Sequence, residues 1–141
     1  MGLMLQIYLI ENAITYAKAK AIKHHIKLYF IVGNVLQMDR LSMEGEFDTI
    51  IDSGLFRMMT DEERPVFARQ IHRVLKSGGK YFMLSFSDKE PEGYGPRRIL
   101  KAEIERTFTP LLNIIYTKNS AFNSRVGSSS IKPYFVSAIK S

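Results

Sequence analysis

Runs of apolar residues of strand length alternate with stretches that have helical spacing. Four of these runs are rich in apolar, aromatic or β-branched residues and stop at small or polar positions, as buried strands do. They are Leu3–Ile10, Leu28–Val32, Phe47–Ile51 and Tyr81–Phe86. Helical patterns between them predict parallel strands joined by right-handed crossovers.

The first helix is expected to begin at Asn12, whose short side chain can accept a hydrogen bond from a free helix amide. Apolar residues follow at helical spacing: Ala13, Ile14, Ala17 and Ala21. The segment from Leu3 to His25 contains neither Gly nor Pro, so one long helix is an alternative. A strand followed by a helix is the preferred interpretation.

The second helix has clearer boundary signals. Thr60–Glu63 has the pattern of a capping box or of a turn just before a helix. Pro65 suits the first helical position, where its missing N–H costs nothing. Gly78 and Gly79 are expected to end this helix.

The C-terminal part predicts a short helix and a hairpin. Ile99–Phe108 is amphipathic, and Asn113–Lys118 and Tyr134–Lys140 have strand character. No helical pattern lies between these two strands, so they should pair antiparallel. The predicted fold class is α/β: a mostly parallel sheet with helices on both faces and an antiparallel C-terminal hairpin.

Composition narrows the function classes. The 141 residues suit a single domain, with 20 Lys plus Arg against 14 Asp plus Glu and a net charge of +6. The basic residues are scattered, so no nucleic-acid partner is expected. The absence of cysteine excludes disulfides and thiolate metal sites, and no His or carboxylate cluster suggests another metal site. Leu3–Ile10 is far shorter than a membrane span of about 20 residues. A cytoplasmic protein without a membrane partner is expected.

Small and polar residues follow three of the expected strands. In open α/β sheets, ligands bind beyond the carboxyl ends of the strands. These ends are Val32–Val35, Ile51–Gly54 and Phe86–Asp88. A nucleotide-like ligand needs this arrangement, but turn formation alone also explains it, and composition slightly favours the turn.

Three segments resemble class I S-adenosylmethionine-dependent methyltransferases: Phe47–Phe56, Asp61–Pro65 and His72–Phe82. The small-molecule group that includes thiopurine-methyltransferase-like proteins is the most similar. The resemblance extends from about Leu5 to Ile139, and Arg73–Gly79 is its most specific element. It implies a Rossmann-like fold and methyl transfer from S-adenosylmethionine to a small-molecule acceptor.

The resemblance also implies roles for individual residues. Asn34 and Val35 would meet the adenine ring, although the family usually has Asp at the position of Asn34. Asp52, Ser53 and Gly54 would lie beside the methionine part of the cofactor. Residues implied in the acceptor pocket are Arg57, Phe86, Asp88 and Arg97. The catalytic residue is not identified; Asp52 and Asp88 are the candidate bases.

Part of the family pattern is missing from the chain. No Gly-rich cofactor loop is present, and the position of the usual ribose-binding carboxylate falls near Tyr8. The resemblance therefore implies one methyltransferase-like domain over residues 1–141 that lacks the family's first strand and helix. A non-catalytic, truncated binding protein is the alternative function. A nucleotide-binding oxidoreductase is less favoured, because it also needs a Gly-rich loop.

The missing strand is the central one in the family's sheet. Its loss would expose two sheet edges, and Leu3–Ile10 is apolar on both faces. Exposed edges pair with whatever backbone is available, and a symmetric dimer lets each copy cover the other. A homodimer is therefore expected.

Overall fold

The computed structural model describes residues 5–8, 11–26, 29–87, 98–120 and 133–141 of the chain. The chain divides into two compact units, Met1–Met43 and Glu44–Ser141, and each is described by itself. The single domain expected from the sequence stays a prediction. Of the helices that the structure describes, none combines the length and the apolar character needed to cross a membrane.

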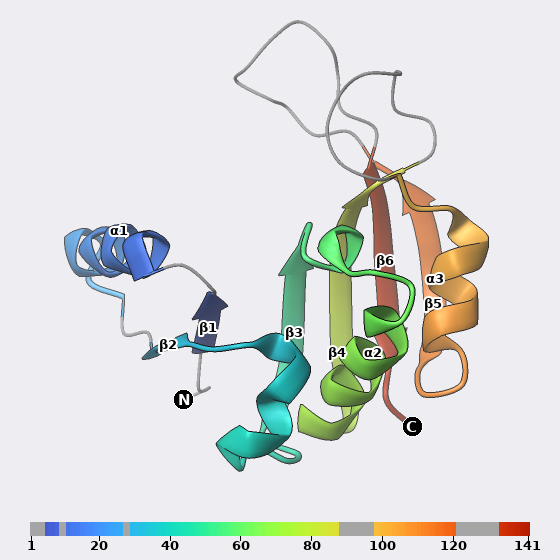
Figure 1. The fold of residues 1–141 in the computed structure, drawn as a ribbon, viewed down its shortest axis with the longest axis horizontal. Coiled ribbons are helices and arrows are strands. Elements are labelled where there is room, and N and C mark those ends of the chain that lie inside the picture. The colour runs from blue at the N-terminus through green and yellow to red at the C-terminus, as the bar shows by residue number, and fades with distance from the viewer. Residues whose placement is uncertain (1–4, 9–10, 27–28, 88–97, 121–132) are drawn as a thin grey trace, which may run out of the picture. The chain divides into compact units, whose positions relative to one another are not determined.

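The first unit is a strand–helix–strand motif. β1 (Leu5–Tyr8) and β2 (Tyr29–Val32) pair in parallel, and α1 (Glu11–Lys23) connects them (Figure 1). A short 3₁₀ helix, η1 (Val35–Leu41), follows. The preferred strand-then-helix interpretation is confirmed, and the alternative of one long helix is wrong. Because α1 begins at Glu11, Asn12 lies in its first turn rather than before it.

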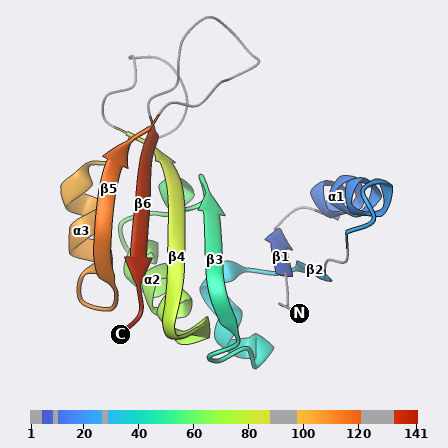
Figure 2. The same cartoon turned by 180° about the vertical axis from the view of Figure 1, so that it is seen from behind.

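The second unit is built on a four-stranded sheet. Its strands are β3 (Phe47–Ser53), β4 (Leu75–Phe86), β5 (Asn113–Asn119) and β6 (Pro133–Ile139), in the order β3-β4-β6-β5. The β3 and β4 strands are parallel, whereas β6 runs antiparallel to both of its neighbours (Figure 2). The α/β class and the antiparallel C-terminal pair are confirmed.

The helices of the second unit are η2 (Phe56–Met58), α2 (Glu63–Val74) and α3 (Lys101–Phe108). Both α2 and α3 lie on the same face of the four-stranded sheet, as the two opposite views show (Figures 1 and 2). Beneath them, four aromatic rings form a core cluster with neighbouring ring centroids 5.2–6.5 Å apart. Its members are Phe56, Phe67, Tyr81 and Phe108, all nearly inaccessible to solvent.

The predicted capping box before α2 is present. The Thr60 amide donates to Glu63 Oε2 at 2.9 Å, and the Glu63 amide donates to Thr60 Oγ1 at 3.3 Å. Each side chain thus satisfies a backbone amide of the other residue. Pro65 is the third helical residue instead of the first, still within the turn that has free amides.

The expectation that Gly78 and Gly79 end α2 is wrong. The helix ends at Val74, and Leu75 is already extended. The last carbonyls are satisfied from far along the chain: Lys140 Nζ donates to the carbonyls of His72 and Leu75 at 2.8 and 2.9 Å. Gly79 is instead required by a close approach, because a Cβ there would lie 2.8 Å from the Lys76 carbonyl oxygen.

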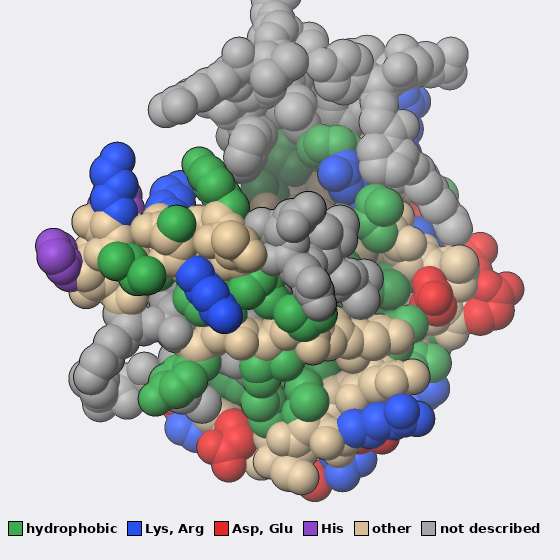
Figure 3. All heavy atoms as spheres, turned by 60° about the vertical axis from the view of Figure 1, so that its left-hand side comes forward, with side chains coloured by type: hydrophobic (Ala, Val, Ile, Leu, Met, Phe, Trp, Pro, Cys, Tyr) green, Lys and Arg blue, Asp and Glu red, His purple; other side chains and the backbone are tan. Residues whose placement is uncertain are grey.

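Figure 3 shows Lys and Arg side chains, and Asp and Glu side chains, on the surface of one face.

Candidate functional site

A buried carboxylate organises the turn that follows β3. Asp52 is 5% exposed. Its Oδ1 accepts a hydrogen bond from the Leu55 amide at 2.7 Å, and its Oδ2 accepts from the Phe56 amide at 3.1 Å. The hydroxyl of Tyr81 on β4 donates to Oδ2 at 2.9 Å. Both carboxylate oxygens are therefore engaged inside the protein.

Burial dominates the electrostatics of this pair. It raises the pKa of Asp52, while the three hydrogen bonds and the charge of Arg57 lower it. Burial and the neighbouring Asp52 also raise the pKa of Tyr81 well above its ordinary value, so the phenol keeps its proton and donates. Through these hydrogen bonds, Asp52 stabilises the turn that follows β3. Its role as a base stays a prediction.

Gly54 is the residue that bends the chain after β3. Its φ of +87° favours glycine, and its amide donates to the Leu84 carbonyl of β4 at 2.8 Å. A Cβ at this position would lie 3.3 Å from Arg57 Nε. The Arg57 side chain therefore occupies the space that a side chain at position 54 would need. Ser53, at the end of the strand, is exposed.

Arg57 is held over the turn by two contacts. Its Nε donates to the Gly54 carbonyl at 3.2 Å, and its guanidinium carbon lies 3.8 Å from the centre of the Phe86 ring. Burial lowers the pKa of Arg57, opposed by the charge of Asp52. Its Nη1 has no hydrogen-bond partner among the described residues. This donor is buried, so it is unsatisfied among the residues that the structure describes.

The candidate residues of the first unit belong to η1. Asn34 is exposed and caps this helix, since its Oδ1 accepts from the Leu36 amide at 2.9 Å. Val35, the next residue, is buried. The local hydrogen bond explains Asn34 as a capping residue; its contact with adenine stays a prediction.

The structure thus brings together Asp52, Gly54, Arg57 and Phe86 of the second unit. Asp88 and Arg97 lie outside the described residues. Sequence analysis did not identify Tyr81 as part of this group. The available signal was a phenol within an almost apolar strand, because a buried hydroxyl needs a partner.

Comparison with known proteins gives a family match over most of the chain. A family model described as a methyltransferase domain matches residues 4–132. No curated protein sequence matches the chain.

Solved structures are similar in fold. A SAM-dependent methyltransferase of Methanosarcina mazei is 19% identical with a TM-score of 0.79, and the match covers 96% of this chain and 81% of that one. The N-methyltransferase NodS of Bradyrhizobium japonicum, solved with S-adenosyl-L-homocysteine, is 15% identical with a TM-score of 0.77 and coverages of 98% and 66%. A 1,6-didemethyltoxoflavin-N1-methyltransferase of Burkholderia thailandensis is 16% identical with a TM-score of 0.74 and coverages of 97% and 60%.

At these identities the likeness establishes the fold alone. The chain spans 50–81% of the length of the eight similar structures.

Proposed function

Because the chain belongs to the class I S-adenosylmethionine-dependent methyltransferases, we propose that it transfers a methyl group from S-adenosylmethionine to a small-molecule acceptor. The observation that carries this proposal is the turn after β3, locked by Asp52 and flanked by a guanidinium with one donor that has no partner among the described residues. Similar structures contain S-adenosylhomocysteine, which supports S-adenosylmethionine as the methyl donor.

Two features of the turn fit such a ligand. The bare backbone of Gly54 lets the Arg57 guanidinium lie against the turn, since a Cβ there would lie 3.3 Å from Arg57 Nε. The Arg57 guanidinium, whose Nη1 has no partner among the described residues, suits a carboxylate on either the cofactor or the acceptor. The Phe86 ring beneath the guanidinium adds a flat apolar surface. We assign the methionine part of the cofactor to Asp52–Gly54 and the acceptor to Arg57 and Phe86.

The protein has a modest chemical task in this reaction. S-adenosylmethionine, when bound, supplies a methyl group on a sulfonium that leaves as a neutral thioether. The chain must therefore align the acceptor and exclude water. Asp52 contributes by keeping Ser53 and Gly54 in one conformation, as both of its oxygens already accept hydrogen bonds. Asp88 is then the candidate base if an acceptor amine or thiol has to lose a proton.

A non-catalytic binding protein was the alternative, and the match over residues 4–132 does not favour it. Placement in the thiopurine-methyltransferase-like group rests on the pattern from Phe47 to Phe82. It would imply an aromatic thiol acceptor.

Calorimetric titration and a turnover assay separate these functions. A methyltransferase binds S-adenosylmethionine saturably and forms S-adenosylhomocysteine when supplied with thiol or amine acceptors, detected by mass spectrometry. Saturable binding with no product for any acceptor supports the binding protein. Absence of binding contradicts both functions.

We also propose that the chain is a cytoplasmic homodimer that pairs through β3. Among the described strands, only β4 pairs with β3, so the other edge of β3 has no partner strand among them. This strand contains neither Lys nor Pro, the residues that usually protect an edge. Ile51 on it is 77% exposed. The opposite edge strand, β5, carries Lys118 and a register shift between Ile114 and Tyr116, both of which discourage pairing.

A further inference from the structure

A second candidate binding site lies on the helix layer of the second unit. A cleft of about 390 Å³ opens between α2 and α3. Its lining residues are Asp61, Arg64, Pro65, Arg69, Arg106, Thr107, Pro110 and Leu111. Three guanidinium groups therefore border one cleft, against a single lining carboxylate, and the functional site described above uses none of these residues.

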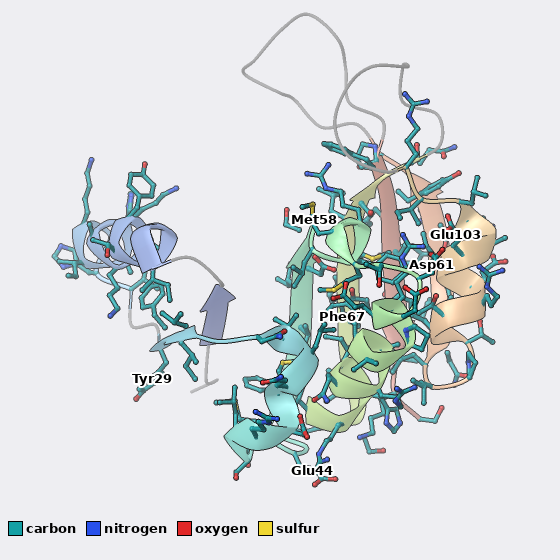
Figure 4. The ribbon with its side chains drawn as sticks, viewed as in Figure 1. Tyr29, Glu44, Met58, Asp61, Phe67 and Glu103 are labelled. Atoms are coloured by element: carbon teal, nitrogen blue, oxygen red, sulfur yellow. The ribbon has the colours of Figure 1, made fainter. Side chains whose placement is uncertain are left out.

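Arg64 is the buried member of this group, at 3% exposure. Its Nη1 donates to Glu103 Oε1 at 2.9 Å and to Asp61 Oδ1 at 3.2 Å. Figure 4 labels Asp61 near the start of α2 and Glu103 on α3. The other two nitrogens, Nε and Nη2, have no partner among the described residues. Buried donors without an acceptor are costly, so such nitrogens indicate a missing ligand or water.

Arg69 and Arg106 are the exposed members. Neither forms a hydrogen bond or an ion pair with another residue that the structure describes. Other cations on the same helices do have partners: Arg73 pairs with Glu44 at 3.3 Å, and Lys101 lies 3.6 Å from Glu105. The unneutralised charges of these two helices thus meet at the cleft.

The chemistry of the lining defines the ligand. Even with Glu103 counted beside Asp61, three Arg against two carboxylates leave the cluster positive. Planar guanidinium groups match the oxygens of phosphate, and a phosphate has enough oxygens to accept from more than one Arg. Pro65, Pro110 and Leu111 add an apolar wall.

We propose that this cleft binds a small phosphate monoester, with the phosphate against the arginines and the organic group against the prolines and Leu111. Arg69 and Arg106 bind the phosphate from opposite helices, and Arg64 supplies donors from below. A carboxylate matches less well, because it carries one negative charge and two oxygens, whereas a phosphate monoester carries nearly two charges at neutral pH and three terminal oxygens for the three arginines.

Calorimetric titration at constant ionic strength tests the proposal with three probes. Phenyl phosphate should bind saturably, inorganic phosphate should bind more weakly, and phenol should not bind. The double variant Arg69→Gln/Arg106→Gln should bind phenyl phosphate about tenfold more weakly or worse. Its matched control, Arg73→Gln/Lys101→Gln, loses the same charge outside the cleft and should stay within about twofold of wild type.

Two results would overturn the site. One is an equal loss of phenyl phosphate affinity in the two double variants, which would show that net charge alone controls binding. The other is a response to phenyl phosphate that sodium chloride reproduces. Arg64→Lys keeps the charge but loses the fork of donors, so it should also weaken binding while circular dichroism confirms the fold. Unchanged affinity in Arg64→Lys contradicts the role of Arg64; if that variant does not fold, the pair of double variants decides.

Discussion

Two buried charges of the second unit differ in how completely they are satisfied. Asp52 receives three hydrogen bonds, and both of its oxygens are engaged. Arg64 uses one nitrogen of three, on Asp61 and Glu103, and the other two have no partner among the described residues. A fully satisfied buried charge fixes the local backbone, whereas a partly satisfied one retains capacity for a ligand. The comparison is consistent with support of the turn by Asp52 and with the proposed recognition of a ligand by Arg64.

Loss of the Asp52 carboxylate should have the largest effect on stability. Asp52→Ala leaves the part-buried Leu55 amide, the buried Phe56 amide and the buried Tyr81 hydroxyl without an acceptor, so it should cost about 3 kcal/mol of unfolding free energy. Asp48→Ala is the matched control on the same strand: its exposed ion pair with Lys76 should contribute less than about 1 kcal/mol. Urea unfolding measures both variants. Similar losses of unfolding free energy in the two variants would show that the hydrogen bonds of Asp52 do not stabilise the fold more than an exposed ion pair does.

Tyr81→Phe tests the same cluster more gently. It removes one of the three donors to Asp52 and keeps the ring that packs against Phe67 and Phe108. We expect a loss of about 1 kcal/mol, measured by urea unfolding. A loss as large as that of Asp52→Ala would mean that the phenol, not the pair of amides, dominates the cluster.

The stability contributed by Asp52 should depend on pH. Its pKa in the folded protein lies above the ordinary value of 3.8, mainly because of burial. The folded state therefore binds this proton more tightly than the unfolded state does, and the associated stability is fully present below the ordinary pKa. It is lost as pH rises through the folded-state pKa. The advantage of wild type over Asp52→Asn should thus decrease from acid toward neutral pH in unfolding experiments; an increase would contradict the sign of the shift.

Features were predictable from the sequence when the residues that form them lie close together along the chain. The capping box of Thr60 and Glu63 was predictable because both residues lie within one turn. The end of α2 was not, since Lys140, which satisfies its last carbonyls, comes 65 residues or more later.

The same limit applies to the candidate site. Asp52 was identified as a strand-end polar residue, but its engagement by Tyr81 depends on the register of β3 against β4. Arg64 was not singled out, because Glu103 is 39 residues away and the cleft exists only once α2 and α3 pack together. The roles of Asn34 and Val35 come from family resemblance; the local structure shows Asn34 as a helix cap and Val35 as a buried residue of η1.

The open edge of β3 gives the smallest expected effect on folding. Ile51→Lys places a charge on an exposed position, so it should change the unfolding free energy of the monomer by less than about 0.5 kcal/mol. It should nevertheless shift sedimentation toward monomer, because a lysine protects an edge from pairing. Ile115→Lys, at an exposed position on the opposite edge strand, is the control. Equal effects of the two variants, or a wild type that is monomeric at micromolar concentration, would reject pairing through β3.

The cofactor affinity of a Gly54 variant tests whether the turn after β3 holds S-adenosylmethionine. Calorimetric titration with S-adenosylhomocysteine compares Gly54→Val with Gly45→Val, whose backbone also has positive φ but whose surroundings are open. Both substitutions strain the backbone, so only the difference between them reports on the turn. The account predicts that Gly54→Val weakens binding about tenfold or more relative to Gly45→Val. Equal affinities in two folded variants would place the cofactor elsewhere.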